Sequence, residues 1–157
     1  MSGHIAGAAV DVFPEEPKSA GDPFVSVLQG LPNVILTPHV GGSTEEAQYD
    51  IGRYVSGKLR DYAQTGATTM SVNVPAVSLS QSPGDTRILH LHRNVPGVLA
   101  RVNTILSEGD VNIDSQQLST KGEYGYAVTD LAGSLPGDVE QRLRELDETV
   151  EVRVITS

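Results

Sequence analysis

Two histidine-containing stretches of this sequence could do chemistry. His39 stands between a proline and two glycines in TPHVGGST, at a strand-to-helix turn, where catalytic histidines and simple turn residues both occur. Asp11 lies in the apolar run IAGAAVDVF, and a lone carboxylate in such a run must find a partner. His90 and His92 alternate in RILHLHR, so they face the same side of a strand, where they could simply pack. A zinc site there needs a further ligand, and no carboxylate is evident nearby.

The composition argues against several classes of function. The 157 residues carry a formal charge of −9, which disfavours binding to nucleic acid or to acidic membranes. No apolar run approaches the roughly 20 residues of a membrane helix, and MSGHIAGAAVDVF lacks the pattern of a secretory signal. The absence of cysteine removes disulfides, thiolate metal sites and cysteine nucleophiles. We therefore expect a cytoplasmic protein.

The first half of the chain has the pattern of an incomplete α/β domain. Residues 5–13 and 33–39 are apolar runs typical of strands covered on both faces. Ser43 and Glu46 match a capping box, which predicts a helix from there to about Thr65, with Gly66 as its stop. Its apolar face is predicted at Ala47, Ile51, Tyr54 or Val55, Leu59 and Tyr62. Two strands and one helix do not close a domain, so we expect uncovered apolar surface here.

The second half, after a polar linker at 78–85, reads as a complete small domain. Strands are predicted at 87–93, 111–119, 124–132 and 150–156, with TKGE as the turn of a hairpin. Helices are predicted at 96–109 and 137–146, the first with Pro96 as its first helical residue. Its apolar face is predicted at Val98, Val102, Ile105 and Leu106. The order βαββαβ is the ferredoxin-like arrangement, with two helices on one face of a four-stranded sheet.

The run AGAAVDVFPEEP, followed by DPF and LPNVILTPHVGGSTEEAQ, resembles the C-terminal part of the D-2-hydroxyacid dehydrogenase family. VNVPAVSL and HLHRNVPGVLARVNTILSEGDVNI resemble a return to the substrate domain and a regulatory ACT domain of that family. The resemblance implies an α/β fold in which the truncated end of a Rossmann-type NAD-binding domain precedes a ferredoxin-like ACT domain. It implies three parts: 1–42 from the NAD-binding domain, 43–83 as long helix and return segment, and 84–157 as ACT domain.

The same resemblance implies roles for the residues around His39. It makes His39 the acid/base that exchanges a proton with the substrate hydroxyl, and Glu16 its carboxylate partner. A carboxylate beside an imidazole favours the protonated form and fixes the tautomer. Asp11 matches the position that contacts the nicotinamide end of NAD, and Gly41 and Gly42 let the backbone approach the cofactor. Without the resemblance, His39 would be read as a turn residue and Glu16 as a solvated loop acid.

The sequence departs from the family in what it lacks. It contains no G-x-G-x-x-G turn that would cradle the pyrophosphate of NAD, and the family's catalytic arginine lies upstream of the matching residues. We therefore expect a C-terminal portion of an NAD-dependent oxidoreductase that does not bind NAD tightly and does not transfer hydride alone.

The resemblance also implies an effector site in the ACT domain. In the family, paired ACT domains bind L-serine at the interface between two subunits, and the matching residues are His92, Asn94 and Asn112. Amides and an imidazole can pair with both ends of an amino acid. We expect a homodimer through ACT sheet edges, and a tetramer in the parent enzyme. Alternatively, Asn94 caps the next helix and Asn112 only begins a strand, and the chain is a free-standing amino-acid sensor or an oligomerisation module without a ligand.

Overall fold

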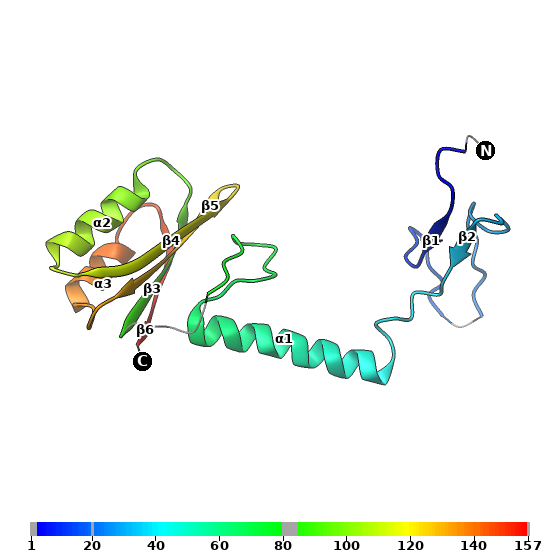
Figure 1. Ribbon diagram of the computed structural model, residues 1–157, viewed down its shortest axis with the longest axis horizontal. Helices are drawn as coiled ribbons and strands as arrows, with labels where there is room; N and C mark the ends of the chain where they lie inside the picture. The colour runs from blue at the N-terminus through cyan, green and yellow to red at the C-terminus, as the bar shows by residue number, and fades with distance from the viewer. Residues whose placement is uncertain (1–2, 20, 80–84, 157) are drawn as a thin grey trace. The chain divides into compact units, whose positions relative to one another are not determined.

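A computed structural model describes residues 3–19, 21–79 and 85–156 of the chain (Figure 1). The chain divides into two compact units, Met1–Tyr54 and Val55–Ser157. Helix α1 (Glu45–Thr65) begins in the first unit and ends in the second. The expected mixed α/β fold is confirmed. Residues 80–84 of the predicted linker lie outside the described residues.

The first unit contains two short parallel strands, β1 (Ala8–Val10) and β2 (Val34–Leu36). Their register pairs Ala8 with Val34 and Val10 with Leu36. The strands are shorter than the apolar runs 5–13 and 33–39, since each has three residues, while the 66% exposure of Ile35 agrees with the uncovered apolar surface expected here. Each strand has one neighbour in the described part of the unit, so the ladder ends where that single pairing ends.

The start of α1 differs from the predicted capping box. The Thr44 hydroxyl accepts the backbone N–H of Ala47 at 3.2 Å, so Thr44 caps the helix in place of Ser43. The acceptor lies three residues before the donor, as in an N-terminal cap, and a threonine hydroxyl can fill this position as a serine hydroxyl does. Gly66 ends the helix as predicted, with φ 80° and its N–H bonded to the Tyr62 carbonyl at 3.0 Å.

The predicted apolar face of α1 is exposed. No residue of this helix is buried, and Ile51 and Leu59 are 48% and 64% exposed. Periodicity therefore predicted the helix correctly, but most of its predicted apolar face is uncovered among the described residues, and the contacts with the sheet are made by its last turn, where Arg153 lies over the Tyr62 ring.

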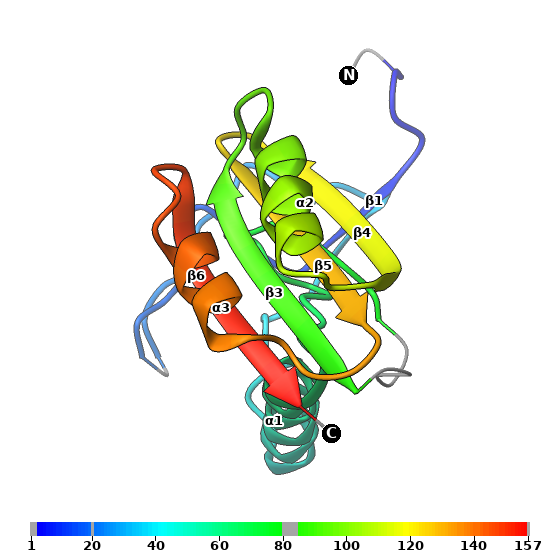
Figure 2. The ribbon, with the colours of Figure 1, turned by 90° about the vertical axis from the view of Figure 1, so that its left-hand side faces the viewer.

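The second unit has the predicted βαββαβ order. Its elements are β3 (Thr86–Arg93), α2 (Val98–Glu108), β4 (Ile113–Lys121), β5 (Tyr124–Leu131), α3 (Gly137–Arg144) and β6 (Thr149–Thr156). The four strands form an antiparallel sheet in the order β4-β5-β3-β6, so β4 and β6 are its edges. Figure 2 shows α2 and α3 on one face of this sheet. The hairpin turn is tighter than TKGE, because both strands run up to Gly122 and Glu123.

The core lies between the helices and this face of the sheet. The buried face of α2 is the predicted one, Val98, Val102, Ile105 and Leu106. These side chains pack with Ile88, Leu131, Val139, Leu143 and Val152. Full burial of each large aliphatic side chain contributes about 1.5–3 kcal/mol, so this cluster is the main stabilising feature of the unit. Pro96 is not the first helical residue, because Gly97 adopts φ 88° and the helix begins at Val98.

The other face of the sheet is covered by the end of α1 and the segment after it. Arg153 donates to the carbonyls of Tyr62 and Ala63, and the Tyr126 hydroxyl donates to the Gly66 carbonyl at 2.8 Å. Val77 packs in a second buried cluster with Leu89, Tyr126 and Val128. Side chains of the sheet therefore bind carbonyls at the C-terminal end of α1 and just after it, where helical backbone acceptors lack some of their partners.

Candidate functional sites

His39 and Glu16 form an ion pair in the first unit. His39 Nδ1 lies 2.9 and 3.0 Å from the two Glu16 carboxylate oxygens, and Glu16 also accepts the Phe13 N–H at 2.9 Å. The hydrogen bond from the Phe13 N–H is the main cause that lowers the pKa of Glu16, and the hydrogen bond with His39 lowers it further. The bond to Glu16 raises the pKa of His39. Because the carboxylate holds Nδ1–H, Nε2 of His39 is the ring nitrogen available for proton exchange.

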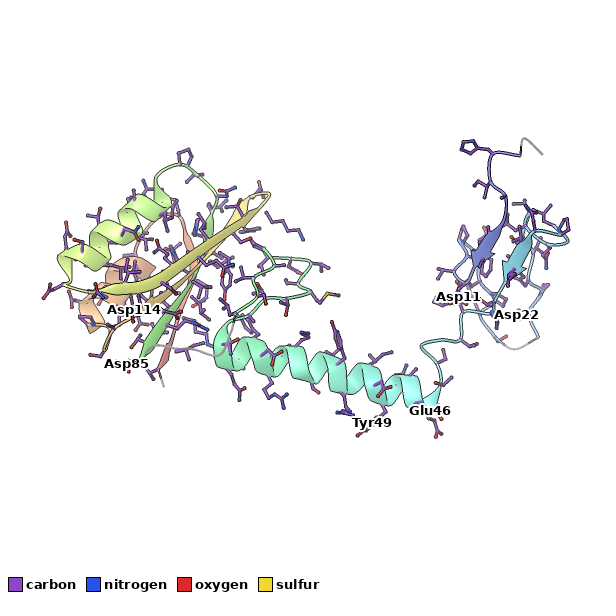
Figure 3. The ribbon with its side chains drawn as sticks, viewed as in Figure 1. Asp11, Asp22, Glu46, Tyr49, Asp85 and Asp114 are labelled. Atoms are coloured by element: carbon purple, nitrogen blue, oxygen red, sulfur yellow. The ribbon has the colours of Figure 1, made fainter. Side chains whose placement is uncertain are left out.

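Asp11 follows β1 (Figure 3), and its side chain forms hydrogen bonds with residues that follow β2. One Asp11 oxygen accepts the Thr37 hydroxyl at 2.5 Å and the His39 backbone N–H at 3.1 Å. The Thr37 hydrogen bond is the main cause that lowers the pKa of Asp11. His39 has φ 52°, a conformation that is unusual for a non-glycine residue, and Asp11 holds the N–H of that strained residue. Thr37 is a site residue that sequence reasoning missed.

A pocket of about 740 Å³ lies beside this pair in the first unit. Its lining includes Phe13, Glu16, Phe24, Leu36 and His39, with the two phenylalanine rings in edge contact at 4.7 Å between centroids. Gly41 and Gly42 follow His39, and a Cβ at either would meet nothing within 4 Å in the described structure. Carboxylate, imidazole and open glycine backbone therefore fit the nicotinamide end of a dinucleotide, whereas a pyrophosphate cradle would have to come from other residues.

His92 and Asn94 lie at the end of β3 that adjoins the hairpin turn. His92 is 3% exposed, and its Nδ1–H donates to the Arg93 carbonyl at 2.8 Å. Its Nε2 is buried and has no hydrogen-bond partner among the described residues. The ring lies against Gly125, where an added Cβ would come within 2.3 Å of it.

Asn94 is exposed and donates from its side chain to the Gly122 carbonyl at 3.2 Å. The helix cap at Gly97 has no side-chain hydrogen bond, so the alternative that Asn94 caps α2 is wrong. The amide instead holds the turn of the β4–β5 hairpin beside the end of β3.

Asn112 lies at the opposite end of the sheet. It precedes β4, where its carbonyl accepts the Ala132 N–H and its side-chain amide donates to Asp114 at 3.4 Å. Thr120, eight residues further along, is level with Gly125 and hence with His92. Eight strand residues span roughly 25 Å, so Asn112 cannot share a small ligand with His92 of the same chain.

No group of three or more His, Cys, Asp or Glu side chains is arranged to hold a metal ion in the ranges that the structure describes. Among the helices of those ranges, none is both long and apolar enough to cross a membrane.

Two family models match the chain. The AHAS small subunit-like ACT domain matches residues 88–154, and the NAD binding domain of D-isomer specific 2-hydroxyacid dehydrogenases matches residues 1–41. The chain thus joins part of the NAD-binding domain of a 2-hydroxyacid dehydrogenase to an ACT domain, as the resemblance implied. The predicted boundaries at residues 42 and 83 stay predictions.

Curated relatives match the chain along nearly its whole length. The chain is 46% identical over 153 residues to D-3-phosphoglycerate dehydrogenase of Haemophilus influenzae, and 45% identical over 154 and 156 residues to those of Dictyostelium discoideum and Escherichia coli K12. These matches cover 98% of this chain but 37% to 38% of each relative. Along nearly its whole length the chain is therefore homologous to the D-3-phosphoglycerate dehydrogenases, and it spans little more than a third of theirs.

Proposed function

We propose that this chain is the regulatory and oligomerising part of an NAD-dependent phosphoglycerate dehydrogenase, and that its ACT domain binds L-serine between two copies. The enzyme would oxidise 3-phosphoglycerate to 3-phosphohydroxypyruvate, the first step of L-serine biosynthesis, so bound L-serine would act as feedback. The homology along 98% of the chain supports the choice of enzyme.

The effector proposal rests on the distance, within one chain, between the three residues that it assigns to the site. His92 and Asn94 lie at the hairpin end of the sheet, while Asn112 lies at the start of β4, roughly 25 Å away. A site built from all three therefore takes His92 and Asn94 from one copy and Asn112 from another.

The position of β4 suggests how two copies could meet. Strand β4 is an edge of the sheet, and Leu118 on it is 42% exposed. An antiparallel pairing of two β4 edges about a two-fold axis places the start of one strand beside the end of the other. Asn112 of a second copy then comes next to Gly122, whose carbonyl binds Asn94. This pairing also removes one exposed sheet edge.

In the first unit, His39, Glu16 and Asp11 are the groups that this chain would contribute to catalysis. NAD, when bound, would supply the hydride acceptor. His39 Nε2 would take the proton of the substrate hydroxyl, and Glu16 holds the imidazole through Nδ1. Asp11, together with Gly41 and Gly42, would adjoin the nicotinamide. Because the sequence has no G-x-G-x-x-G turn, we do not expect the chain to transfer hydride by itself.

The test is calorimetric titration of the chain with L-serine, together with sedimentation equilibrium. We expect a dimer with one saturable site per chain, and no binding by His92→Ala or by Asn112→Ala. A mixed dimer of these two variants has one intact site and one doubly altered site, so it should regain half of the binding. If the mixed dimer binds no L-serine while the parent chain does, the residues do not act across an interface.

The alternative of an oligomerisation module without ligand makes the opposite prediction. In that case the chain dimerises, but L-serine, glycine and L-alanine all fail to produce saturable heat. The same titration therefore decides between the two functions.

A further inference from the structure

His90 is buried beside the proposed effector site. Its ring centroid lies 5.1 Å from that of His92, and both side chains lie on the face of the sheet that α2 and α3 cover. His90 is 1% exposed. Both rings carry one nitrogen that is buried and has no hydrogen-bond partner among the described residues, Nδ1 in His90 and Nε2 in His92.

The hydrogen bonds of His90 determine which nitrogen carries its proton. Its Nε2 lies 2.7 Å from the Thr149 hydroxyl, and that hydroxyl donates its only proton to the Leu143 carbonyl at 2.7 Å. Thr149 must therefore accept from His90 Nε2–H. Nδ1 of the neutral ring is then a lone-pair acceptor. Burial, with a smaller contribution from His92, lowers the pKa of His90 to about 4, so the ring is neutral at pH 7.

His92 has the opposite tautomer. Its Nδ1 lies 2.8 Å from the Arg93 carbonyl, which can only accept, so the proton is on Nδ1 and the lone pair of the neutral ring is on Nε2. Two neighbouring imidazoles thus each present an acceptor without a donor. Leaving a buried acceptor unpaired is unfavourable, so a group with N–H or O–H donors is the chemical complement of the pair.

We infer that His90 is a further specificity-determining residue of the effector site, and that its Nδ1 accepts, alongside His92 Nε2, hydrogen bonds from a donor group of the bound amino acid. This inference rests on the proposed function. The ammonium and the side-chain hydroxyl of L-serine are the two groups that could supply the donor, and L-alanine has only the ammonium. His92 stands where β3 ends and the chain turns through Asn94 and Gly97 into α2, and such turns open at lower cost than strands or helices.

The first experiment observes the imidazole nitrogens of the full chain by nitrogen-15 NMR during titration with L-serine, with L-alanine as second ligand. Without ligand we expect His90 to be protonated on Nε2 and His92 on Nδ1. On saturation with L-serine, His90 Nδ1 and His92 Nε2 should both shift to hydrogen-bonded values. A shift of His90 Nδ1 with L-alanine as well identifies the ammonium as donor, whereas a shift with L-serine alone identifies the hydroxyl.

Three outcomes would overturn the inference. If L-serine binds and shifts only His92, then His90 merely packs and the proposed function survives. If His90 Nδ1 is hydrogen-bonded before L-serine is added and does not change, a resident water is its donor. If calorimetry detects no L-serine binding, the proposed function and this inference fail together.

Variants provide a second measurement. His90→Phe keeps a ring of similar size but removes the lone pair, and we expect it to weaken L-serine binding about tenfold, as for one lost hydrogen bond. Thr149→Val leaves the imidazole in place but removes the acceptor that fixes its tautomer, so binding should weaken by a smaller factor. His4→Phe, at an exposed histidine of the first unit, is the matched control and should bind as the parent does.

Discussion

The buried ion pair between Arg87 and Asp130 supports a quantitative prediction about stability. Arg87 is 2% exposed and donates to both Asp130 oxygens, at 2.6 and 2.9 Å, while a third N–H reaches the Thr65 carbonyl at 3.0 Å. Asp130 also accepts the Ser115 hydroxyl at 2.9 Å. Replacing Arg87 with methionine keeps much of the volume, but it leaves a buried carboxylate without its cation. Breaking a buried pair in this way costs about 3–5 kcal/mol.

The assay is urea unfolding of the full chain, followed by circular dichroism. With a slope of about 1–3 kcal/mol per molar urea, the midpoint for Arg87→Met should fall by more than about 1 M. The double variant Arg87→Met, Asp130→Leu removes both charges and should recover most of the loss. Arg144→Met is the matched control, because Arg144 pairs with Glu140 at 45% exposure and such pairs contribute below about 1 kcal/mol. If Arg87→Met unfolds at the same urea concentration as Arg144→Met, the burial argument is wrong.

The pH dependence of the same pair has a defined sign. The bonds from Arg87 are the main cause that lowers the pKa of Asp130. A carboxylate with a lowered folded-state pKa contributes stability above its unfolded pKa of about 3.9, and that contribution is lost as pH falls through the folded value. Acid titrations followed by circular dichroism should therefore show that the free energy of unfolding falls more steeply with decreasing pH in the parent than in Arg87→Met, Asp130→Leu, which lacks this carboxylate.

Further expectations concern individual side chains at the two sites. His39 should titrate above the ordinary histidine pKa by NMR, and Glu16→Gln should return its pKa toward that value, because Glu16 is the main cause of the rise. The stability that the His39–Glu16 pair contributes should be present below the unfolded histidine pKa of about 6.5 and be lost as pH rises through the folded pKa of His39. Chemical shifts of the first unit, recorded in the same titration, check this expectation. Gly125→Ala should abolish L-serine binding in calorimetry, since its Cβ would collide with the His92 ring, whereas Gly137→Ala, with no atom within 4 Å in the described structure, should not.

Patterns of apolar residues predicted the second unit well because its core is complete. The buried face of α2 is the one that periodicity predicted. The βαββαβ order along the chain is also the predicted one, since it follows from four alternating or apolar runs with two amphipathic helices between them. The start of α2 was predicted two residues too early. Proline is common as the first residue of a helix, but the left-handed backbone of Gly97 means that this helix begins only at Val98. In the first unit the same rules overestimated the strands, since burial depends on neighbours that sequence patterns do not supply.

Site residues were predicted from a resemblance, and their hydrogen bonds could not be read from residue types. Thr37 follows β2 and looks like an ordinary strand-end threonine, yet its hydroxyl is the main cause of the lowered pKa of Asp11. His90 and His92 were predicted to share a strand face, but their tautomers depend on Thr149 and on a carbonyl. Those partners are set by tertiary structure and not by spacing along the chain.

The two sites differ in what one copy of the chain can assemble. Asp11, Glu16 and His39 are joined by hydrogen bonds within one unit, so their electrostatics can be measured in a single chain. His92 and Asn112 lie at opposite ends of one sheet, so the proposed effector affinity must depend on protein concentration, because dimerisation supplies half of each site. L-serine should in turn strengthen the dimer by the same factor, since coupling between ligand binding and association is reciprocal. In the two-residue hairpin that joins Lys121 to Tyr124, alternate residues of β4, Leu118 among them, point their N–H groups away from β5. Leu118→Pro should therefore weaken the outer edge of β4 and lose L-serine binding with every proposed ligand residue intact, as calorimetry and sedimentation at matched concentrations would show.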